Sequence, residues 1–114
     1  MYYPGMETLT HGQVLARFGH ALSDPLRARL LLALREGPGY PAQLADLLGT
    51  SRQNLSNHLA CLRGCGLVVA VPEGRRTRYE LADGHLAHAL GHLLGVVLAV
   101  DPAACGASEE KGCC

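Results

Sequence analysis

Five cysteines are the residues of this 114-residue chain whose type and spacing point most directly to chemistry. Cys61 and Cys65 are four positions apart, so on a helix both thiols lie on one face, within reach of a common ion. Thiolates are soft ligands that favour Cd, Pb, Hg, trivalent As, Cu(I) or Zn over hard cations. Two ligands do not make a specific site, so a third is expected from Cys105 or from the terminal pair Cys113 and Cys114. The alternative is burial as small hydrophobic side chains, which suits Cys61 better than Cys65, between two glycines.

Polar side chains gather directly before the cysteine pair, in residues 52–58. Leu55, Leu59 and Leu62 recur at helical spacing and form an inward stripe, which leaves the outward positions free to contact a partner. Amide side chains pair bidentately with adenine edges, and arginine pairs with guanine or phosphate. The segment therefore predicts a DNA-reading helix. Its expected contact residues are Arg52, Gln53, Asn54, Ser56, Asn57, His58 and Arg63.

Three helices are expected to precede the reading helix, over about residues 11–22, 25–36 and 41–48. Asp24 as N-cap and Pro25 at the first helical position give the clearest helix start in the chain. Apolar residues recur at helical spacing in each segment, and glycines follow the second and third. A short turn then leads from the third helix into the reading helix.

The reading helix is expected to begin with a cap and to lead into a β-hairpin. Thr50 or Ser51 is the predicted cap, and Gln53 is placed to complete a capping box with Thr50. Residues 67–71 and 77–81 are rich in β-branched residues and flank a turn-forming segment, which is typical of a hairpin. The hairpin tip is basic, so it would reach phosphates.

The complete order of predicted elements is α-α-α-α-β-β-α, closing on a helix over about residues 84–100. This order is that of a winged helix-turn-helix, in which the second helix of the pair enters the major groove and the wing follows the backbone. Arg75, Arg76 and Arg78 of the wing would add salt-dependent phosphate contacts. A helix-turn-helix that binds only protein is the alternative. We therefore predict a mainly α fold with a β-hairpin wing. The winged-helix domain is expected over residues 11–100, between a flexible N-terminus at 1–10 and a cysteine-containing tail at 101–114.

The net charge of zero conceals an uneven distribution of charge along the chain. Residues 50–80 hold five arginines against two glutamates, a balance of +3, whereas residues 81–114 hold Lys111 against four acids, a balance of −3. Arginine, which makes up all the other cations, suits bidentate phosphate and base-edge contacts. Double-stranded operator DNA is therefore an expected partner of the basic middle segment.

The size and apolar content of the chain predict one domain that pairs with a second copy. A chain of 114 residues has room for a single core, and the last helix is apolar around most of its circumference. Its uncharged run of 17 residues contains three histidines and does not span a bilayer, so no membrane association is expected. The N-terminus lacks the pattern of a signal peptide, which predicts the cytoplasm and reduced thiols.

The segment 56–70, which contains Cys-Leu-Arg-Gly-Cys at 61–65, resembles the recognition helix and following strand of the ArsR/SmtB metal-sensing repressors, and above all of the family's cadmium and lead sensors. Residues 22–27, 40–45 and 96–101 are also similar, and the resemblance covers about residues 13–105. The cysteine motif is its most specific part, because most of the family place their cysteines elsewhere. The Cys-x-Cys of the arsenic sensors is absent from residues 43–48.

The resemblance implies a homodimer, held mainly by its first and last helices, that represses transcription as apo-protein and releases DNA on binding metal. It implies that Cys61 and Cys65 of one subunit and Cys105 of the other coordinate Cd(II) or Pb(II) through three sulfurs. The residues themselves leave open whether Cys105 acts within its own subunit. They also leave As(III) or Zn(II) as alternative inducers, since the vicinal pair Cys113 and Cys114 suits trivalent arsenic.

Histidines on the last predicted helix offer a second, less favoured metal site. His85, His88 and His92 share one helical face, and with Asp83 they resemble the Asp-x-His half-site of the family's zinc sensors. The histidine pair that completes that site is missing, because valines stand at 96 and 97. Polar or interface histidines are therefore the preferred interpretation.

Two further functions deserve comparison with a metal-responsive repressor. A repressor of the same fold could respond to thiol oxidation, through a disulfide among Cys61, Cys65 and Cys105. A small thiol enzyme would use Cys65 as nucleophile and His58 as base, but the sequence shows no framework for an oxyanion site or a pocket. We therefore expect no enzymatic activity and no small organic substrate.

Overall fold

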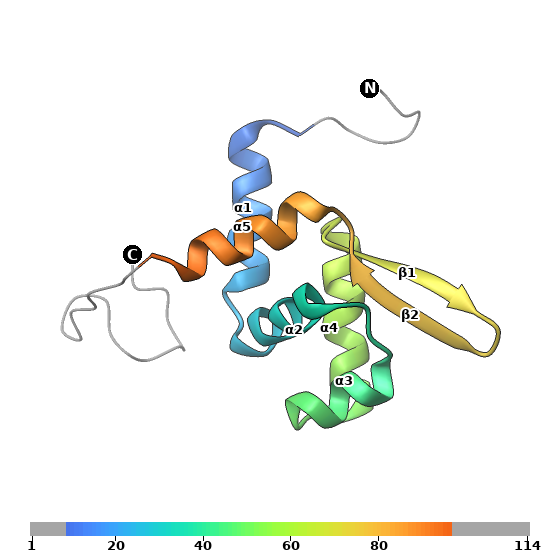
Figure 1. The fold of residues 1–114 in the computed structure, drawn as a ribbon. Helices are drawn as coiled ribbons and strands as arrows, with labels where there is room; N and C mark the ends of the chain where they lie inside the picture. Colours follow the sequence, from blue (N-terminus) through green and yellow to red (C-terminus); the bar gives the residue numbers. More distant parts are fainter. Residues whose placement is uncertain (1–8, 97–114) are drawn as a thin grey trace.

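The computed structural model describes residues 9–96, which form five helices and one β-hairpin (Figure 1). The elements are α1 (His11–Leu22), α2 (Pro25–Glu36), α3 (Pro41–Leu48), α4 (Arg52–Gly64), β1 (Val68–Glu73), β2 (Arg76–Leu81) and α5 (Gly84–Leu94). The predicted element order and the winged helix-turn-helix fold are confirmed. Most of the predicted N-terminal segment and all of the cysteine-containing tail lie outside the described residues.

Side-chain caps fix where the first helices begin. Thr10 and Gln13 form a reciprocal capping box at the start of α1. The carboxylate of Asp24 accepts a 2.9 Å hydrogen bond from the backbone N–H of Arg27, with Pro25 in the first turn of α2, as predicted. These caps satisfy backbone donors that have no partner within the helix.

The start of α4 differs in one detail from the prediction. Ser51 is the N-cap, accepting from the backbone N–H of Asn54, so the predicted capping box between Thr50 and Gln53 is wrong. The Thr50 hydroxyl instead accepts from the side chain of Asn54, and Gln53 donates to Asn57 one turn later. With Ser51 as the cap, Gln53 stands one position too early to reach back to the cap's backbone.

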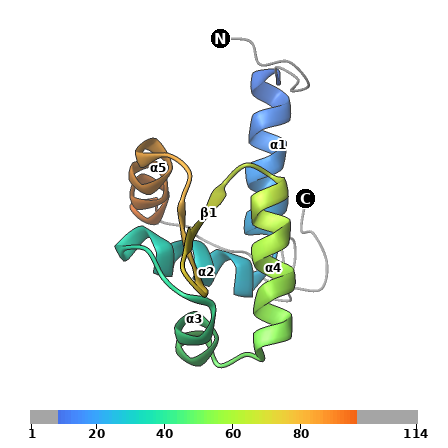
Figure 2. The ribbon, with the colours of Figure 1, turned by 90° about the vertical axis from the view of Figure 1, so that its right-hand side faces the viewer.

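The core is built almost entirely from leucine. Leu30, Leu31 and Leu34 of α2 are buried at the centre of the molecule. The stripe predicted on α4 packs in the same core, as do two leucines of α5: Leu55, Leu59, Leu62, Leu86 and Leu90. Burying each leucine contributes about 2 kcal/mol, so this core sets the position of the reading helix. Figure 2 shows α2 at the centre, with α4 and α5 on either side of it.

The hairpin forms the wing, and its strands are longer than predicted. β1 and β2 pair antiparallel from Val68 opposite Leu81 to Glu73 opposite Arg76, so only Gly74 and Arg75 form the turn. Gly74 has φ +62°, the left-handed conformation that a tight hairpin turn requires at this position. A two-stranded sheet leaves each strand one open edge, which explains how β1 can include Pro72.

The last helix is shorter than predicted. α5 ends at Leu94 with Gly95 as its C-cap, whereas hydrophobic spacing predicted a helix to about residue 100. An apolar pattern continues past Gly95, but periodicity alone does not show where a glycine ends the helix. Residues 97–100 lie outside the described part. Within residues 9–96 we find no helix that is long and apolar enough to span a membrane.

Candidate functional site

The N-terminal half of α4 presents the predicted polar face to solvent. The side chains of Arg52, Gln53, Asn54, Ser56 and Asn57 are all exposed, and Arg63 is exposed near the helix end. α3 and α4 join through Gly49, whose φ of +67° ends α3 and turns the chain. A short turn and a leucine core thus place six of the seven predicted α4 contacts on the surface.

Hydrogen bonds hold the amide side chains of this face in one arrangement. The amide nitrogen of Gln53 donates to the side-chain oxygen of Asn57 over 3.1 Å, and that of Asn54 donates to the Thr50 hydroxyl over 2.9 Å. Each bond leaves further donors and acceptors unused on the same side chains. The face is therefore ordered and still able to bind base edges.

His58 differs from the other predicted contacts on α4. Its side chain is 17% exposed and its Nε2 lies 3.9 Å from a carboxylate oxygen of Asp24, the N-cap of α2. The hydrogen bond from the Arg27 backbone, together with the charge of His58, lowers the pKa of Asp24. His58 therefore connects α4 to the body of the domain.

The wing arginines divide into two groups. Arg75 and Arg76 are exposed at the turn, and the Arg76 guanidinium stacks 3.5 Å from the centre of the Tyr40 ring. Arg78 lies further down the wing, where it is ion-paired to Glu73 and 3.4 Å from Glu80. Arg75 and Arg76 are therefore exposed at the wing turn, with Arg76 stacked on Tyr40, whereas Arg78 is held by carboxylates.

Tyr40 attaches the wing to the segment before α3. Its hydroxyl donates a hydrogen bond to Glu73, and this bond raises the pKa of Tyr40. Gly39 and Tyr79 exchange backbone hydrogen bonds of 2.8 and 2.9 Å at the same junction. These contacts fix the direction of the wing relative to the start of α3.

Cys61 and Cys65 lie at the opposite end of α4 from the polar face, and both are free thiols and half-buried. Cys65 is the C-cap of α4 and keeps helical backbone angles, and its N–H bonds to the Cys61 carbonyl over 3.0 Å. Regular i, i+4 geometry therefore holds for the pair, as predicted. Cys105, Cys113 and Cys114 lie outside the described residues.

Helix α1 faces the two thiols. The Cys61 sulfur is 3.9 Å from Nε2 of His20, and Cys65 lines a groove of about 400 Å³ together with residues of α1, His20 and Arg17 among them. Sequence reasoning missed His20, which is 41 positions from Cys61 and belongs to no spacing motif. Within residues 9–96, no three His, Cys, Asp or Glu side chains are close enough to form a complete metal site.

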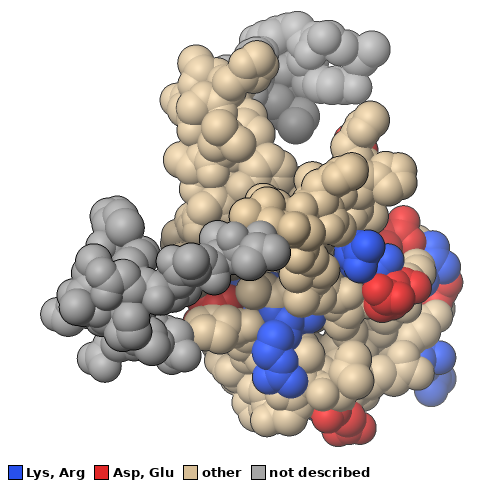
Figure 3. Space-filling model, turned by 60° about the vertical axis from the view of Figure 1, so that its left-hand side comes forward, with Lys and Arg blue, Asp and Glu red and all other residues tan. Residues whose placement is uncertain are grey.

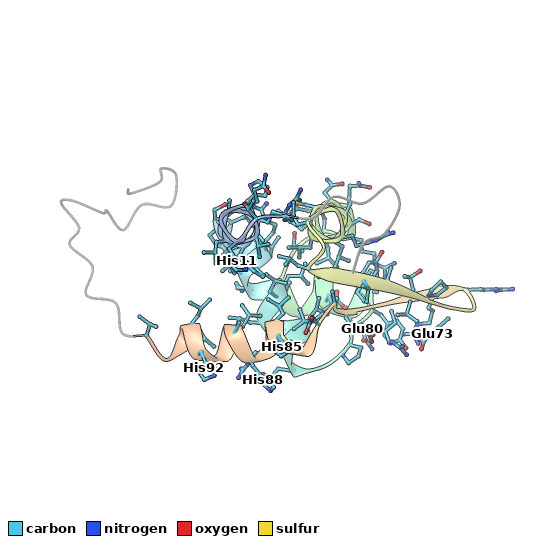
Figure 4. All side chains as sticks on the ribbon, turned by 90° about the horizontal axis from the view of Figure 1, so that it is seen from above. His11, Glu73, Glu80, His85, His88 and His92 are labelled. Carbon is cyan, nitrogen blue, oxygen red and sulfur yellow. The ribbon has the colours of Figure 1, made fainter. Side chains whose placement is uncertain are left out.

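The histidines of α5 do not gather into a site within the single chain. His85, His88 and His92 are exposed along one side of the helix (Figure 4), whereas Asp83 caps α5 through a 2.7 Å hydrogen bond from the His85 backbone. His92 lines the apolar groove described next. Within residues 9–96 these histidines belong to no metal-binding group, and their role as polar or interface residues stays a prediction.

An apolar groove of about 420 Å³ lies between α1 and α5. Leu15 on α1 and Leu93 on α5 line it, with 68% and 55% of their surfaces exposed. Phe18 and Leu90 form part of its floor. The surface over these helices carries few charged residues (Figure 3), because Arg17 is the only Lys, Arg, Asp or Glu in α1 and α5.

Comparison with known proteins identifies close relatives. Residues 24–69 match the family described as bacterial regulatory protein, arsR family. The HTH-type transcriptional regulator CmtR of Mycobacterium tuberculosis is 67% identical over 87 residues, which are 76% of this chain and 74% of that protein. A protein of Streptomyces lividans described as a probable mercury resistance operon repressor is 38% identical over 95 residues, which are 83% of this chain and 74% of that protein.

Solved structures agree with these matches. The NMR structure of the cadmium metal-sensor CmtR from Mycobacterium tuberculosis superposes with a TM-score of 0.63 at 66% identity, covering 75% of this chain and 90% of that one. A homodimeric winged helix-turn-helix DNA-binding domain from Mycobacterium bovis superposes with a TM-score of 0.69 at 26% identity, covering 79% and 88%.

Proposed function

Because the chain belongs to the ArsR family of bacterial transcriptional regulators, we propose that it is a cytoplasmic repressor that binds operator DNA as an apo-dimer and releases it on binding Cd(II) or Pb(II). One observation carries the proposal: a single helix, α4, presents an exposed polar face at one end and two half-buried thiols at the other. An ion bound by the thiols acts on the same rigid element that reads DNA.

The proposed DNA contacts divide between α4 and the wing. Arg52, Gln53, Asn54 and Asn57 read base edges in the major groove, with Ser56 beside them. Arg63 is a further proposed contact, in the last turn of α4. Arg75 and Arg76 neutralise phosphates and give salt-dependent affinity. His58 and Arg78, whose partners lie within the domain, position α4 and stiffen the wing.

The apolar groove between α1 and α5 supports pairing of two copies. Its exposed leucines would be covered in a homodimer, and the winged-helix relative from Mycobacterium bovis is described as homodimeric. Two α4 helices related by a two-fold axis can then read two half-sites, and their spacing depends on how α1 and α5 pack.

Cys61 and Cys65 supply two thiolates, and we assign the third to Cys105. The donor set fits a soft ion, since both thiols are free and lie one helical turn apart, and Cys65 lines a groove that opens to solvent. The bound ion would crosslink the tail to α4, with either the same or the partner subunit providing the tail. The identity to a cadmium sensor favours Cd(II), and As(III) and Zn(II) are the alternatives to test.

Crosslinking α4 couples metal binding to DNA binding. The two affinities are linked reciprocally, so DNA-bound protein must also bind metal more weakly. A hundredfold loss of DNA affinity requires only about 2.7 kcal/mol of coupling. A change in the position or mobility of α4 is sufficient for that, without any rearrangement of the leucine core.

Titration of the reduced protein with Cd(II) and with Pb(II) tests the site directly. We expect sulfur-to-metal charge-transfer absorption that saturates at one ion per chain, and we expect Cys61→Ser, Cys65→Ser and Cys105→Ser each to weaken it. Cys113→Ser is the matched control and should behave like the unmodified protein. Absence of the band would overturn the proposed site, and an undiminished band in Cys105→Ser would overturn the third ligand.

A further inference from the structure

We propose that His20 of α1 is a further ligand of the thiolate site, so that a bound cation is held by nitrogen from α1 as well as by sulfur from α4. The inference rests on the proposed function and deepens it. It starts from the one contact across the α1 and α4 interface that brings a histidine to a cysteine, Nε2 of His20 to Sγ of Cys61.

The separation of these two atoms suits two ligands of one ion. In a tetrahedral site with metal–nitrogen and metal–sulfur distances near those of zinc, the ligand atoms are about 3.6 Å apart, and a larger ion widens that spacing. The observed distance is 3.9 Å. Cys61 and His20 can therefore share an ion with small side-chain rotations and no movement of either helix.

Hydrogen bonds from Ser23 and from Arg27 of α2 hold the backbone of His20 in place. Its carbonyl accepts hydrogen bonds from Ser23, through the backbone N–H at 3.3 Å and the hydroxyl at 2.7 Å, and from Arg27 at 2.8 Å. Arg27 also donates to the Ala21 carbonyl over 3.1 Å. The end of α1 is thus fixed to α2, while the exposed imidazole keeps the freedom to turn toward a ligand.

All three candidate ligands lie near one open space. His20 and Cys65 line the same groove, and the Cys61 sulfur contacts the imidazole beside it. The cysteine Cβ atoms are about 5–6 Å apart at i, i+4 spacing, so rotation of the Cys65 side chain brings its sulfur toward the same point. Arg17 also lines this groove, and its positive charge would complement the negative charge of several thiolates around a divalent ion.

A nitrogen ligand from α1 has two consequences. Imidazole suits borderline ions, so the site would accept Co(II) and Zn(II) in addition to Cd(II). The ion would also connect the reading helix to α1 of the same subunit, whose Leu15 and Phe18 line the apolar groove. Metal binding would then act on α4 and on the proposed dimer surface together.

Cadmium-113 NMR of full-length, nitrogen-15-labelled protein tests the inference, with His20→Gln compared with His11→Gln. His11 is the matched control because it is exposed on α1 and lies nine residues from His20, half a turn away around the helix. We expect a direct coupling between cadmium and one imidazole nitrogen, lost in His20→Gln and kept in His11→Gln. Cadmium affinity should fall about tenfold or more in His20→Gln alone.

The result separates this inference from the proposed function. A full sulfur-to-cadmium absorption band with no cadmium–nitrogen coupling, and equal affinities in both histidine variants, would overturn the role of His20 and leave the thiolate site standing. Absence of the absorption band from the unmodified protein would overturn both.

Discussion

At the scale of single residues, Cys61 and Cys65 lie one helical turn apart on α4, and His20 of α1 contacts Cys61. The spacing of Cys61 and Cys65 placed both thiols on one turn, and the structure agrees because i, i+4 geometry depends on the helix alone. His20 and the pairing of His58 with Asp24 could not be predicted, since each depends on how two helices pack. A side chain that is polar in sequence can face a partner helix as readily as DNA.

Asp24 gives the first prediction. Asp24→Ala removes the N-cap of α2 and should lower the free energy of unfolding by about 1 kcal/mol at pH 7. The folded state lowers the pKa of Asp24, so its charge stabilises the fold above the ordinary value of 3.8. That contribution is lost as the pH falls through the lowered pKa.

Urea unfolding at pH 7 and at successively lower pH measures this effect. The difference between the unmodified protein and Asp24→Ala should shrink below about pH 4, as the carboxylate is protonated. Asp46→Ala, at an exposed position in α3, is the control and should change stability little. A difference that is unchanged down to the lowest pH would show that the charge of Asp24 contributes nothing.

At the scale of elements, caps and glycines predicted most boundaries, and the errors have local causes. The wing strands extend further than β-propensity indicated, because pairing continues until Gly74 allows the turn. α5 ends earlier than its apolar pattern, because Gly95 caps it. The sequence predicted phosphate contacts for three wing arginines, but it does not reveal that one of them, Arg78, is ion-paired to carboxylates within the wing.

The division of the wing arginines gives the second prediction. Arg75→Ala should weaken DNA binding and reduce the slope of log affinity against log salt by about 1, because one phosphate contact is lost. Arg78→Ala should change that slope much less, because its guanidinium is already paired with Glu73. Fluorescence anisotropy with labelled DNA at several salt concentrations measures both slopes. Equal losses of slope would contradict the division.

At the scale of the whole molecule, a small leucine core leaves one large apolar surface uncovered. The sequence predicted pairing from the apolar last helix, and the structure adds that α1 and α5 form a groove together. The geometry of the dimer interface could not be predicted from the sequence, because the groove is formed by two helices that are distant along the chain. The family resemblance, confirmed by 67% identity to a known regulator, supplied the function that packing alone could not.

The third prediction concerns this groove. Leu15→Asp places a charge on the apolar face and should convert the dimer to monomer, with a large loss of DNA affinity because two half-sites are no longer read together. Leu47→Asp is the matched control, since Leu47 on α3 is 65% exposed and lies away from the groove. Sedimentation velocity gives the oligomeric state. A Leu15→Asp variant that stays dimeric would move the interface elsewhere.

The central claim is that one helix both reads DNA and binds the inducing ion. Its most direct test is the anisotropy of labelled DNA from upstream of the protein's own gene, measured on adding one equivalent of Cd(II) per chain. We predict about a hundredfold loss of DNA affinity, equivalent to about 2.7 kcal/mol, in the unmodified protein and none in Cys61→Ser. Release that persists in Cys61→Ser, or DNA that stays bound to the cadmium-loaded unmodified protein, would contradict the claim.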